Sequence, residues 1–337
     1  MKKVFITGTA GFIGYHLAKL LLEEGYTVKG YDGMTAYYDV SLKRRRHDLL
    51  QQNPAFSFTE GMLEDGDLLQ RVAEEFKPDI IVHLAAQAGV RYSIENPRAY
   101  IDANILGSFH VLEIARLHNV EHLLMASTSS VYGANEEMPF AEVDSADTQL
   151  TLYAATKKAN EAMAHSYSNL WGIPTTMLRF FTVYGPMGRP DLALYKFVDA
   201  ILDGREIDIY NKGEMYRDFT YVDDLANAIR LLFSACPQKP RCRSEIDDWD
   251  SLSPVAPFRV VNIGNSKKVK LLDFIEVIEN QLGISAKRNL MPMQMGDVPA
   301  TLADTRLLEE LTGYSPQTGI EEGVGKFVEW FRDYYQR

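Results

Sequence analysis

The sequence predicts an α/β fold with a doubly wound parallel sheet and a smaller, interleaved C-terminal α/β part. Three observations carry this prediction. Short apolar runs alternate with helical patterns through the first half, a glycine-rich loop follows the first run, and the regular alternation loosens after residue 185. Apolar strands that alternate with helices are typical of a parallel sheet covered on both faces and joined by right-handed crossovers.

The first half of the chain contains the strands of the predicted sheet and the helices that connect them. The first helix follows the glycines and ends near Gly25, a residue type that favours a helix C-cap. Further helices are expected near 66–76, 98–118 and 152–170. The predicted strands are, in chain order, Val4–Thr7, Thr27–Tyr31, Phe56–Thr59, Ile80–Leu84, His122–Ala126 and Thr175–Phe180.

The second half has a looser pattern, with helices expected near 191–203, 223–235, 271–282, 304–312 and 319–335. The segment 236–257 is rich in proline and carries an acidic patch at Glu245–Asp250, so we expect an exposed loop with a solvated patch. The expected division is a first domain over 1–185, with later contributions from about 215–235, and a second over 186–337.

Composition excludes several classes of protein. The chain has 337 residues, of which 46% are hydrophobic and 24% charged, as in a globular protein. Lys+Arg 35 against Asp+Glu 46 gives a net charge of −11, which argues against a broad surface for nucleic acid or anionic membranes. The sequence contains no run of 18 apolar residues, so we expect no membrane-spanning helix. Cys236 and Cys242 lack the spacing of a zinc site. We therefore expect a cytoplasmic protein with no metal, no membrane and no nucleic-acid partner.

The loop between the first strand and the first helix contains Gly8, Gly11 and Gly14, with Phe12 and Ile13 between the last two. Glycines at the N-terminus of a helix allow backbone N–H groups to approach a pyrophosphate closely. Asp32 ends the next strand, where its carboxylate would accept the ribose hydroxyls of the adenosine and repel a 2′-phosphate. This combination predicts a Rossmann-type site for NAD. A tight turn beside an ordinary strand-end Asp is the structural alternative.

The basic run Lys43–Arg46 lies beyond Asp32 in a predicted helix. It could suggest NADP or nucleic acid, but an exposed, solvated helix face is the preferred interpretation.

A tyrosine and a lysine, Tyr153 and Lys157, stand at i and i+4 on one face of a predicted helix. A neighbouring cation stabilises phenolate over phenol, so Tyr153 could act as a base below its usual pKa of about 10. Alone, the pair could equally be a packed aromatic beside a solvated lysine. However, the hydroxyl-rich run Ser127–Ser130 follows a buried strand at the carboxyl-terminal edge of the sheet, where α/β proteins place ligands.

These motifs together resemble the extended short-chain dehydrogenase/reductase family over nearly the whole chain. The segments that carry the likeness to its nucleotide-sugar enzymes are Ala85–Arg91, Ser127–Gly133, Phe180–Pro186 and Arg217–Asp224. The segments Gly33–Thr35, Tyr37–Asp39 and Met187–Asp191 resemble the UDP-glucuronate 4-epimerases in particular. The resemblance implies that the second domain binds a nucleotide sugar, and that the protein epimerises C4 of UDP-glucuronate to give UDP-galacturonate.

The resemblance also implies a role for individual residues. The base would be Tyr153, Lys157 would lower its pKa and hold the nicotinamide ribose, and Thr128 would relay the proton. A tightly bound, recycled NAD would be contacted by Gly8, Gly11, Phe12, Ile13, Gly14, Asp32, Leu63, Leu84, Ala85, Ala86, Asn104, Tyr153 and Lys157. The UDP-sugar would be contacted by Gln87, Ser129, Ser130, Thr182, Arg189, Tyr210 and Arg217. Among these, Thr182 and Arg189 would hold the sugar carboxylate, and Arg217 would meet the diphosphate.

Departures from related families decide between reactions. Ser129 is neutral where UDP-glucuronate decarboxylases and nucleoside-diphosphate-glucose dehydratases carry an acid. UDP-galactose 4-epimerases have Asn in place of Thr182 and commonly carry Arg where this chain has Gln294. Met62 stands where many relatives place an Asp near adenine.

Several alternatives stay open at the level of sequence. UDP-galactose 4-epimerase and UDP-glucuronate decarboxylase are the alternatives within the enzyme class. A catalytically silent NAD-binding sensor or scaffold is the alternative from a different class. Relatives commonly form homodimers through two helices per subunit, which predicts an interface at 98–118 and 152–170 by analogy.

Overall fold

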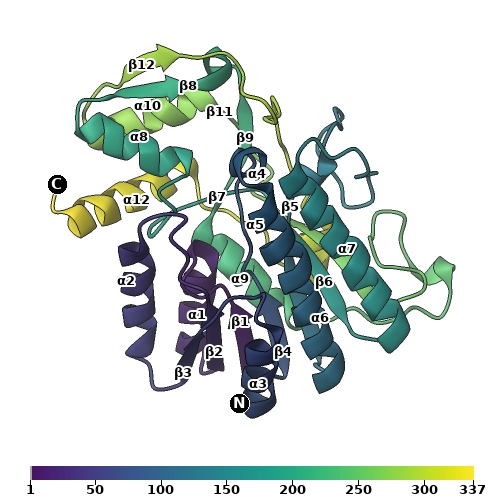
Figure 1. Cartoon of the computed structure of the whole chain (residues 1–337). Coiled ribbons are helices and arrows are strands. Elements are labelled where there is room, and N and C mark those ends of the chain that lie inside the picture. The colour runs from purple at the N-terminus through teal and green to yellow at the C-terminus, as the bar shows by residue number, and fades with distance from the viewer. Residues whose placement is uncertain (1) are drawn as a thin grey trace.

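A seven-stranded parallel sheet forms the centre of the computed structural model, which describes residues 2–337 (Figure 1). All six strand pairs are parallel, and β1 has β2 on one side and β4 on the other, so the chain reverses its direction of winding there. The predicted doubly wound fold is therefore confirmed. From one edge to the other the strands are β3 (Phe56–Glu60), β2 (Thr27–Asp32), β1 (Lys3–Thr7), β4 (Ile80–His83), β5 (His122–Thr128), β6 (Thr175–Phe180) and β10 (Phe258–Ile263).

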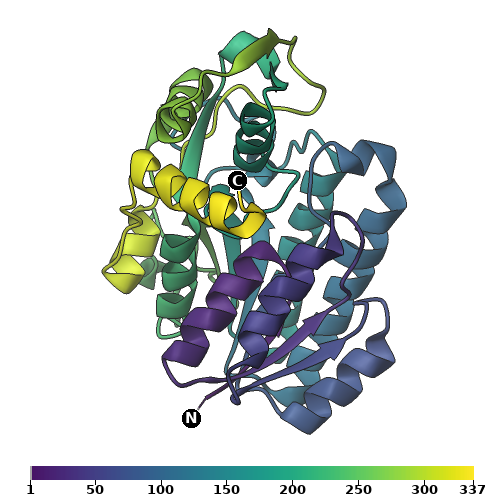
Figure 2. The same cartoon turned by 90° about the vertical axis from the view of Figure 1, so that its left-hand side faces the viewer.

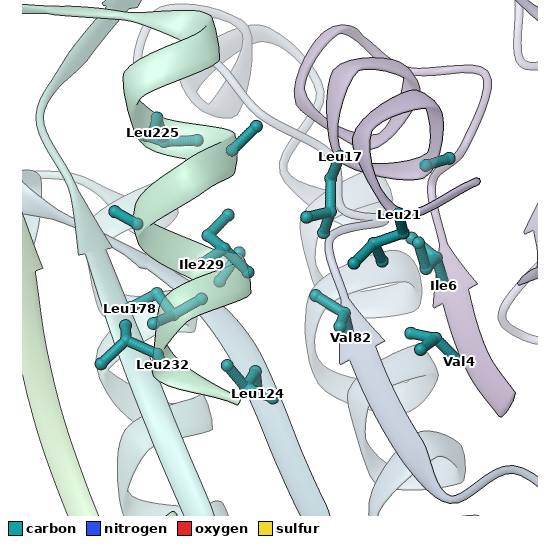
Figure 3. Close-up of a cluster of buried hydrophobic side chains, with 14 of the residues drawn as sticks. Val4, Ile6, Leu17, Leu21, Val82, Leu124, Leu178, Leu225, Ile229 and Leu232 are labelled. Carbon is teal, nitrogen blue, oxygen red and sulfur yellow. The ribbon is translucent and has the colours of Figure 1, made fainter. Parts of the chain in front are cut away.

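Helices cover both faces of this sheet (Figures 1 and 2). One face carries α1 (Phe12–Glu23), α2 (Val40–Gln51), α9 (Val222–Leu232) and α11 (Arg306–Thr312). The other carries α3 (Gly66–Phe76), α6 (Gly107–His118) and α7 (Leu152–Trp171). Figure 3 shows how α1 and α9 bury the first face: Leu17 and Leu21 from α1 and Ile229 from α9 are fully buried above strand residues such as Ile6 and Leu124. These apolar side chains recur every three or four residues, which is why the segments fold as amphipathic helices on the sheet.

The predicted helix over 98–118 is interrupted in its first half. After α4 (Tyr92–Glu95), the chain runs through α5 (Pro97–Tyr100) and a π-helical stretch, Ile101–Leu106, before α6 begins. Wide π-turns inside helices often occur at functional sites, because they redirect a side chain. Here the buried side chain in the π-helical stretch is Asn104.

A smaller layer lies beyond the carboxyl-terminal edge of the main sheet (Figure 1). It has a three-stranded sheet of β7 (Thr182–Tyr184), β9 (Tyr216–Tyr221) and β11 (Lys268–Lys270), and a two-stranded sheet of β8 (Glu206–Ile209) and β12 (Lys287–Leu290). Its helices are α8 (Ala193–Leu202), α10 (Leu271–Leu282) and α12 (Ile320–Tyr335). Figure 2 shows α12 crossing between this layer and α1, and its Trp330 packs against the apolar cores of both.

The second half of the chain supplies elements to both layers. Within 215–235, α9 packs on one face of the main sheet. Further along the chain, β10 (Phe258–Ile263) is a strand of the main sheet itself. β10 pairs with β6 from Phe258 opposite Thr175 to Ile263 opposite Phe180. A strand paired with another more than 80 residues away has no local signature of its partner, so the sequence pattern did not reveal it.

The segment 236–257 is irregular, as predicted, but the expectation that it is simply exposed was wrong for several residues. Ile246 and Ala256 are buried. Asp250, part of the acidic patch, accepts two hydrogen bonds from Arg259, at 2.9 and 2.8 Å. Because Arg259 lies on β10, at the edge of the main sheet, it supplies the partner that keeps this carboxylate out of bulk water.

The loop that precedes α7 carries a buried carboxyl group, that of Glu142, which lies against β10 at the edge of the main sheet. Glu142 is 7% exposed, and its Oε1 accepts a hydrogen bond from the Asn262 N–H at 2.8 Å. Burial raises the pKa of Glu142 to about 8, because it disfavours the charged form.

This group makes stability depend on pH. Between the unfolded pKa of 4.5 and the folded value of about 8, the folded protein keeps a proton that the unfolded chain releases, so stability falls as the pH rises through this range. We expect Glu142→Gln to leave the melting temperature nearly unchanged at pH 5 and to raise it by a few degrees at pH 8.5. Thermal denaturation from pH 5 to 9 checks this, with exposed Glu136→Gln as the control. Parallel curves for Glu142→Gln and the wild type would contradict it.

Candidate active site

The predicted site residues gather at the carboxyl-terminal edge of the main sheet, beside the reversal of winding between β1 and β4. This is the position where open α/β sheets bind ligands, because loops from neighbouring strands diverge there and leave a crevice. The glycine loop follows β1, Asp32 ends β2, Leu84 follows β4 and Thr128 ends β5.

The glycine loop is packed too closely for side chains. Gly8 has a φ of +87°, and a Cβ there would lie 2.7 Å from the backbone nitrogen of Ala85. A Cβ on Gly14, in the first turn of α1, would lie 2.0 Å from the carbonyl oxygen of Gly8. The glycine loop therefore lies directly against α1 and against the loop that follows β4. The N-terminus of α1 points toward the crevice, as binding of a pyrophosphate requires.

Asp32 organises the turn that follows β2. Its carboxylate is 8% exposed and accepts hydrogen bonds from the N–H groups of Ala10, at 3.0 Å, and Met34, at 2.9 Å. Each carboxylate oxygen has capacity for a further hydrogen bond. The side chain thus joins the glycine loop to the next turn and still has acceptor sites for hydroxyl groups.

The basic run on α2 was wrongly expected to be solvated throughout. Arg46 is fully buried and donates to the carbonyl oxygens of Ala10, at 2.8 Å, and Met187, at 2.6 Å. Lys43 is also buried and donates to Thr35 at 3.0 Å. Because positions 43 and 46 are three residues apart, they share the inward face of α2. Arg46 therefore holds the glycine loop against the segment that carries Arg189.

Asn104 is fully buried, and both ends of its side-chain amide are hydrogen-bonded to the protein. Its Oδ1 accepts from the Gln87 N–H at 2.8 Å, and its Nδ2 donates to the Gln87 carbonyl and to Thr156 Oγ1, both at 3.0 Å. It thereby fixes the loop Ala85–Gln87 to α7. The predicted contact of Asn104 with the cofactor would thus act through this loop. Leu63, after β3, is buried, and its carbonyl accepts from His110 at 2.8 Å.

The first turns of α7 bring Tyr153 to the end of β5. The N-cap of the helix is Thr151, whose side chain accepts from the Ala154 N–H at 3.3 Å. Tyr153 packs edge-on against Tyr100, with ring centroids 6.0 Å apart. Burial raises the pKa of the Tyr153 phenol, whereas a hydrogen bond with Thr128 and the charge of Arg189 both act to lower it. The structure thus brings together the predicted base and the predicted relay.

Lys157 lies one turn further along α7. Its Nζ donates to the carbonyl of Ala126 at 3.0 Å, and burial lowers its pKa to about 8. The predicted effect of Lys157 on the pKa of Tyr153 stays a prediction. The i, i+4 spacing places the two side chains on one face but does not set where the ammonium group points.

Arg189 is held by a carboxylate from its own segment. Its Nε and Nη2 donate to the two oxygens of Asp191, at 2.9 and 2.6 Å, and Tyr37 donates to the same carboxylate at 3.4 Å. One edge of the guanidinium is therefore occupied, and Nη1 donates to none of residues 2–337, so it can bind a second anion. Thr182, at the start of β7, lines one small cavity together with Arg189.

The remaining predicted residues are divided among the neighbouring loops. Ser129 and Ser130 form a 3-10 turn after β5, where the Thr128 hydroxyl accepts from the Ser130 N–H at 3.2 Å. The side-chain Nε2 of Gln87 donates to the carbonyl of Ala88 at 3.2 Å. In the smaller layer, Tyr210 begins a short 3-10 stretch and Arg217 lies on β9.

Three residues of the site were not assigned a role from sequence: Tyr37, Arg46 and Asp191. Tyr37 and Asp191 lie inside the segments that resemble UDP-glucuronate 4-epimerases, so a signal was present there. For Arg46 the signal was its helical spacing from buried Leu42 and Leu50.

The glycine loop, a strand-end Asp32 and a Tyr–Lys pair beside a hydroxyl group define a Rossmann-type dinucleotide-binding protein of the short-chain dehydrogenase/reductase kind. Residues 4–242 match the model of the NAD dependent epimerase/dehydratase family. The chain belongs to this family, which confirms the resemblance predicted from its motifs.

Relatives with similar sequences and structures extend over the whole chain. The chain is 56% identical, over 99% of its length and 98% of the relative's, to a "Probable UDP-glucuronate 4-epimerase" of Rhizobium meliloti. A crystal structure of UDP-glucuronic acid 4-epimerase from Bacillus cereus in complex with UDP-glucuronic acid and NAD matches with a TM-score of 0.88 and 30% identity, covering 99% of this chain and 100% of that one. A UDP-glucose 4-epimerase from Thermotoga maritima with UDP-glucose matches with a TM-score of 0.85 and 28% identity, covering 99% of each chain.

Within residues 2–337, no helix is long and apolar enough to cross a membrane. The same residues contain no group of three or more His, Cys, Asp or Glu side chains placed to hold a metal ion.

Proposed function

We propose that this protein interconverts UDP-glucuronate and UDP-galacturonate by epimerisation at C4, with NAD as a bound and recycled cofactor. The observation that carries the proposal is the placement of Tyr153, on the first turn of α7, beside Thr128 at the end of β5, where Thr128 and the positive charge of Arg189 both act to lower the pKa of the phenol. Oxidation of a sugar alcohol needs a group that accepts the hydroxyl proton, and a neighbouring sugar carboxylate needs a cation to bind it. The 56% identity to a relative described as a UDP-glucuronate 4-epimerase supports the same substrate.

The residues around the glycine loop fit a dinucleotide. Gly8 and Gly14 leave no room for a Cβ, the N-terminus of α1 favours a phosphate, and Asp32 has free acceptor capacity. The Thr9 hydroxyl in the same loop is buried without a hydrogen-bond partner among residues 2–337. When bound, NAD supplies a hydride acceptor for C4 and returns the same hydride in the second half of the reaction.

The protein's own residues would manage the proton and the sugar. Tyr153 would take the proton from the C4 hydroxyl and later return it, with Thr128 bridging the two oxygens. Arg189, held by Asp191, would bind the sugar carboxylate through its free Nη1, with Thr182 as a second donor. Ser129 brings no acid beside the relay, which favours epimerisation over decarboxylation or elimination.

Product analysis tests this proposal. The purified protein is incubated with UDP-glucuronate and no added NAD, and the nucleotide sugars and CO₂ are measured. We expect UDP-galacturonate to form without CO₂. UDP-pentose would indicate a decarboxylase, turnover of UDP-galactose alone would indicate the hexose epimerase, and no turnover of either would favour a silent NAD-binding module.

We also propose that the protein forms a homodimer through the outer faces of α6 and α7. Large apolar side chains are exposed there, including Phe109 and Leu117 of α6 and Leu170 and Trp171 of α7, each at least 41% exposed. A second copy that packs the same two helices would cover them in a four-helix arrangement. Light scattering after gel filtration should give twice the chain mass, and a monomer at micromolar concentration would contradict the dimer.

A further inference from the structure

Two arginines from different parts of the chain face one carboxylate. Arg91 comes from the loop after β4, and its Nη2 lies 3.5 Å from Oδ2 of Asp297. Arg217 comes from β9, and the charge of Asp297 also acts on its guanidinium. One carboxylate cannot neutralise two guanidinium groups, so a surplus positive charge remains at this point between the layers.

The described residues leave most of the hydrogen-bond donors of Arg217 without a partner. The Arg217 side chain donates one hydrogen bond among the described residues, from Nη1 to the carbonyl of its neighbour Tyr216 at 2.8 Å. Burial lowers the pKa of Arg217, and the charge of Asp297 acts in the opposite direction. A guanidinium has five N–H donors, so most of those on Arg217 are free for an oxyanion.

Arg91 is directed toward the smaller layer even though its side chain is 46% exposed. Its guanidinium carbon lies 4.7 Å from the centroid of the Tyr210 ring, a cation–π contact that orients the guanidinium plane. Tyr210 and Arg217 belong to the same layer, on either side of the turn between β8 and β9. The aromatic ring thus holds Arg91 beside the residues that the proposed function assigns to the nucleotide.

The segment that carries Asp297 provides no cation of its own. Residues 290–300 contain no Lys or Arg, and Gln294 stands where related epimerases commonly have an arginine near the nucleotide. Gly296, with a φ of +83°, packs this segment against Thr151 and Val90, because a Cβ there would lie 2.9 and 3.2 Å from their side chains. Asp297 is thereby brought next to Arg91.

We propose that Arg91 binds the diphosphate of the sugar nucleotide together with Arg217, and so supplies the positive charge that Gln294 does not. This rests on the proposed function, because a diphosphate is the group that the UDP-sugar places there. A diphosphate carries at least two negative charges, and guanidinium groups bind such oxyanions through paired N–H donors.

The test compares UDP with uridine, two probes that share the nucleoside and differ in the phosphates. We expect Arg91→Ala to weaken UDP binding by about 10- to 100-fold in calorimetry, as the loss of a charge-assisted contact requires. Uridine binding, measured by competition, should change by less than about twofold, and Arg91→Lys should restore part of the UDP affinity. The control is Arg98→Ala, which removes an 82% exposed arginine paired with Asp102 on the neighbouring helix and should leave both affinities unchanged.

Two results would overturn the proposal. Equal losses for UDP and uridine would mean that Arg91 only supports the segment around Asp297, and unchanged UDP binding would mean that it does not meet the phosphates. Bound NAD and the melting temperature show whether the variant is folded. Because UDP binding is measured without turnover, a wild-type protein that binds UDP but fails to epimerise UDP-glucuronate would reject the proposed function and leave this test intact.

Discussion

Replacement of Tyr153 by phenylalanine is expected to lower kcat for UDP-glucuronate by about 10²- to 10⁴-fold, the contribution typical of a positioned general base. Thr128 and the charge of Arg189 both act to lower the pKa of this phenol, which favours its role as a base. Phenylalanine keeps the ring that packs against Tyr100, so the fold and the crevice should be preserved. Progress curves of UDP-galacturonate formation give the rate, and the NAD released on denaturation gives the occupancy.

The matched control for this variant lies on the same helix. Tyr167, about four turns further along α7, donates to Glu113 at 2.6 Å and is not part of the crevice. Tyr167→Phe should keep wild-type kcat, and Tyr153→Phe should keep wild-type NAD content. If Tyr153→Phe retains more than about a tenth of the wild-type kcat, the phenol is not the base.

Replacement of Arg189 by alanine is expected to change the product as well as the rate. Oxidation at C4 makes the sugar a β-keto acid, which loses CO₂ when its carboxylate can rotate into line with the carbonyl. A guanidinium fixed on one edge by Asp191 leaves Nη1 to bind that carboxylate and restrain the rotation. Without it, we expect kcat/KM for epimerisation to fall by about 10- to 100-fold, and the ratio of UDP-pentose to UDP-galacturonate to rise.

The ratio of products separates this role from a general loss of binding. Nucleotide sugars resolved by chromatography, together with captured CO₂, give the ratio for Arg189→Ala and for the exposed control Arg205→Ala, which should behave as the wild type. Among residues 2–337, the ion pairs of Arg205 are with the surface carboxylates of Asp199 and Asp203. A slower reaction with no increase in decarboxylation would show that Arg189 does not restrain the carboxylate.

The parts of the site that were predictable from sequence depend on short, fixed spacings. The glycine loop, Asp32 and the Tyr153–Lys157 pair each need particular residue types a few positions from a strand or helix end, so the order of the chain reveals them. The sheet could be predicted for the same reason, because buried parallel strands are continuous apolar runs.

Features that depend on distant packing were missed or misjudged. Whether Arg46 is solvated depends on the carbonyls of Ala10 and Met187, which no local pattern brings to α2. The i, i+4 spacing places Lys157 on the face of Tyr153, but it does not reveal the carbonyl of Ala126, to which the ammonium group donates. Arg91 has a role only because Asp297, more than 200 residues later, folds back beside it.

The central claim is that one hydrogen leaves C4 as hydride and returns to the opposite face of the same carbon. UDP-glucuronate labelled with deuterium at C4 tests it directly, with no added NAD and with mass spectrometry of both epimers at equilibrium. The account predicts that UDP-galacturonate keeps the deuterium at C4 and takes none from solvent D₂O in the converse experiment. Loss of the C4 label to solvent, or exchange into a second molecule of substrate, would contradict it.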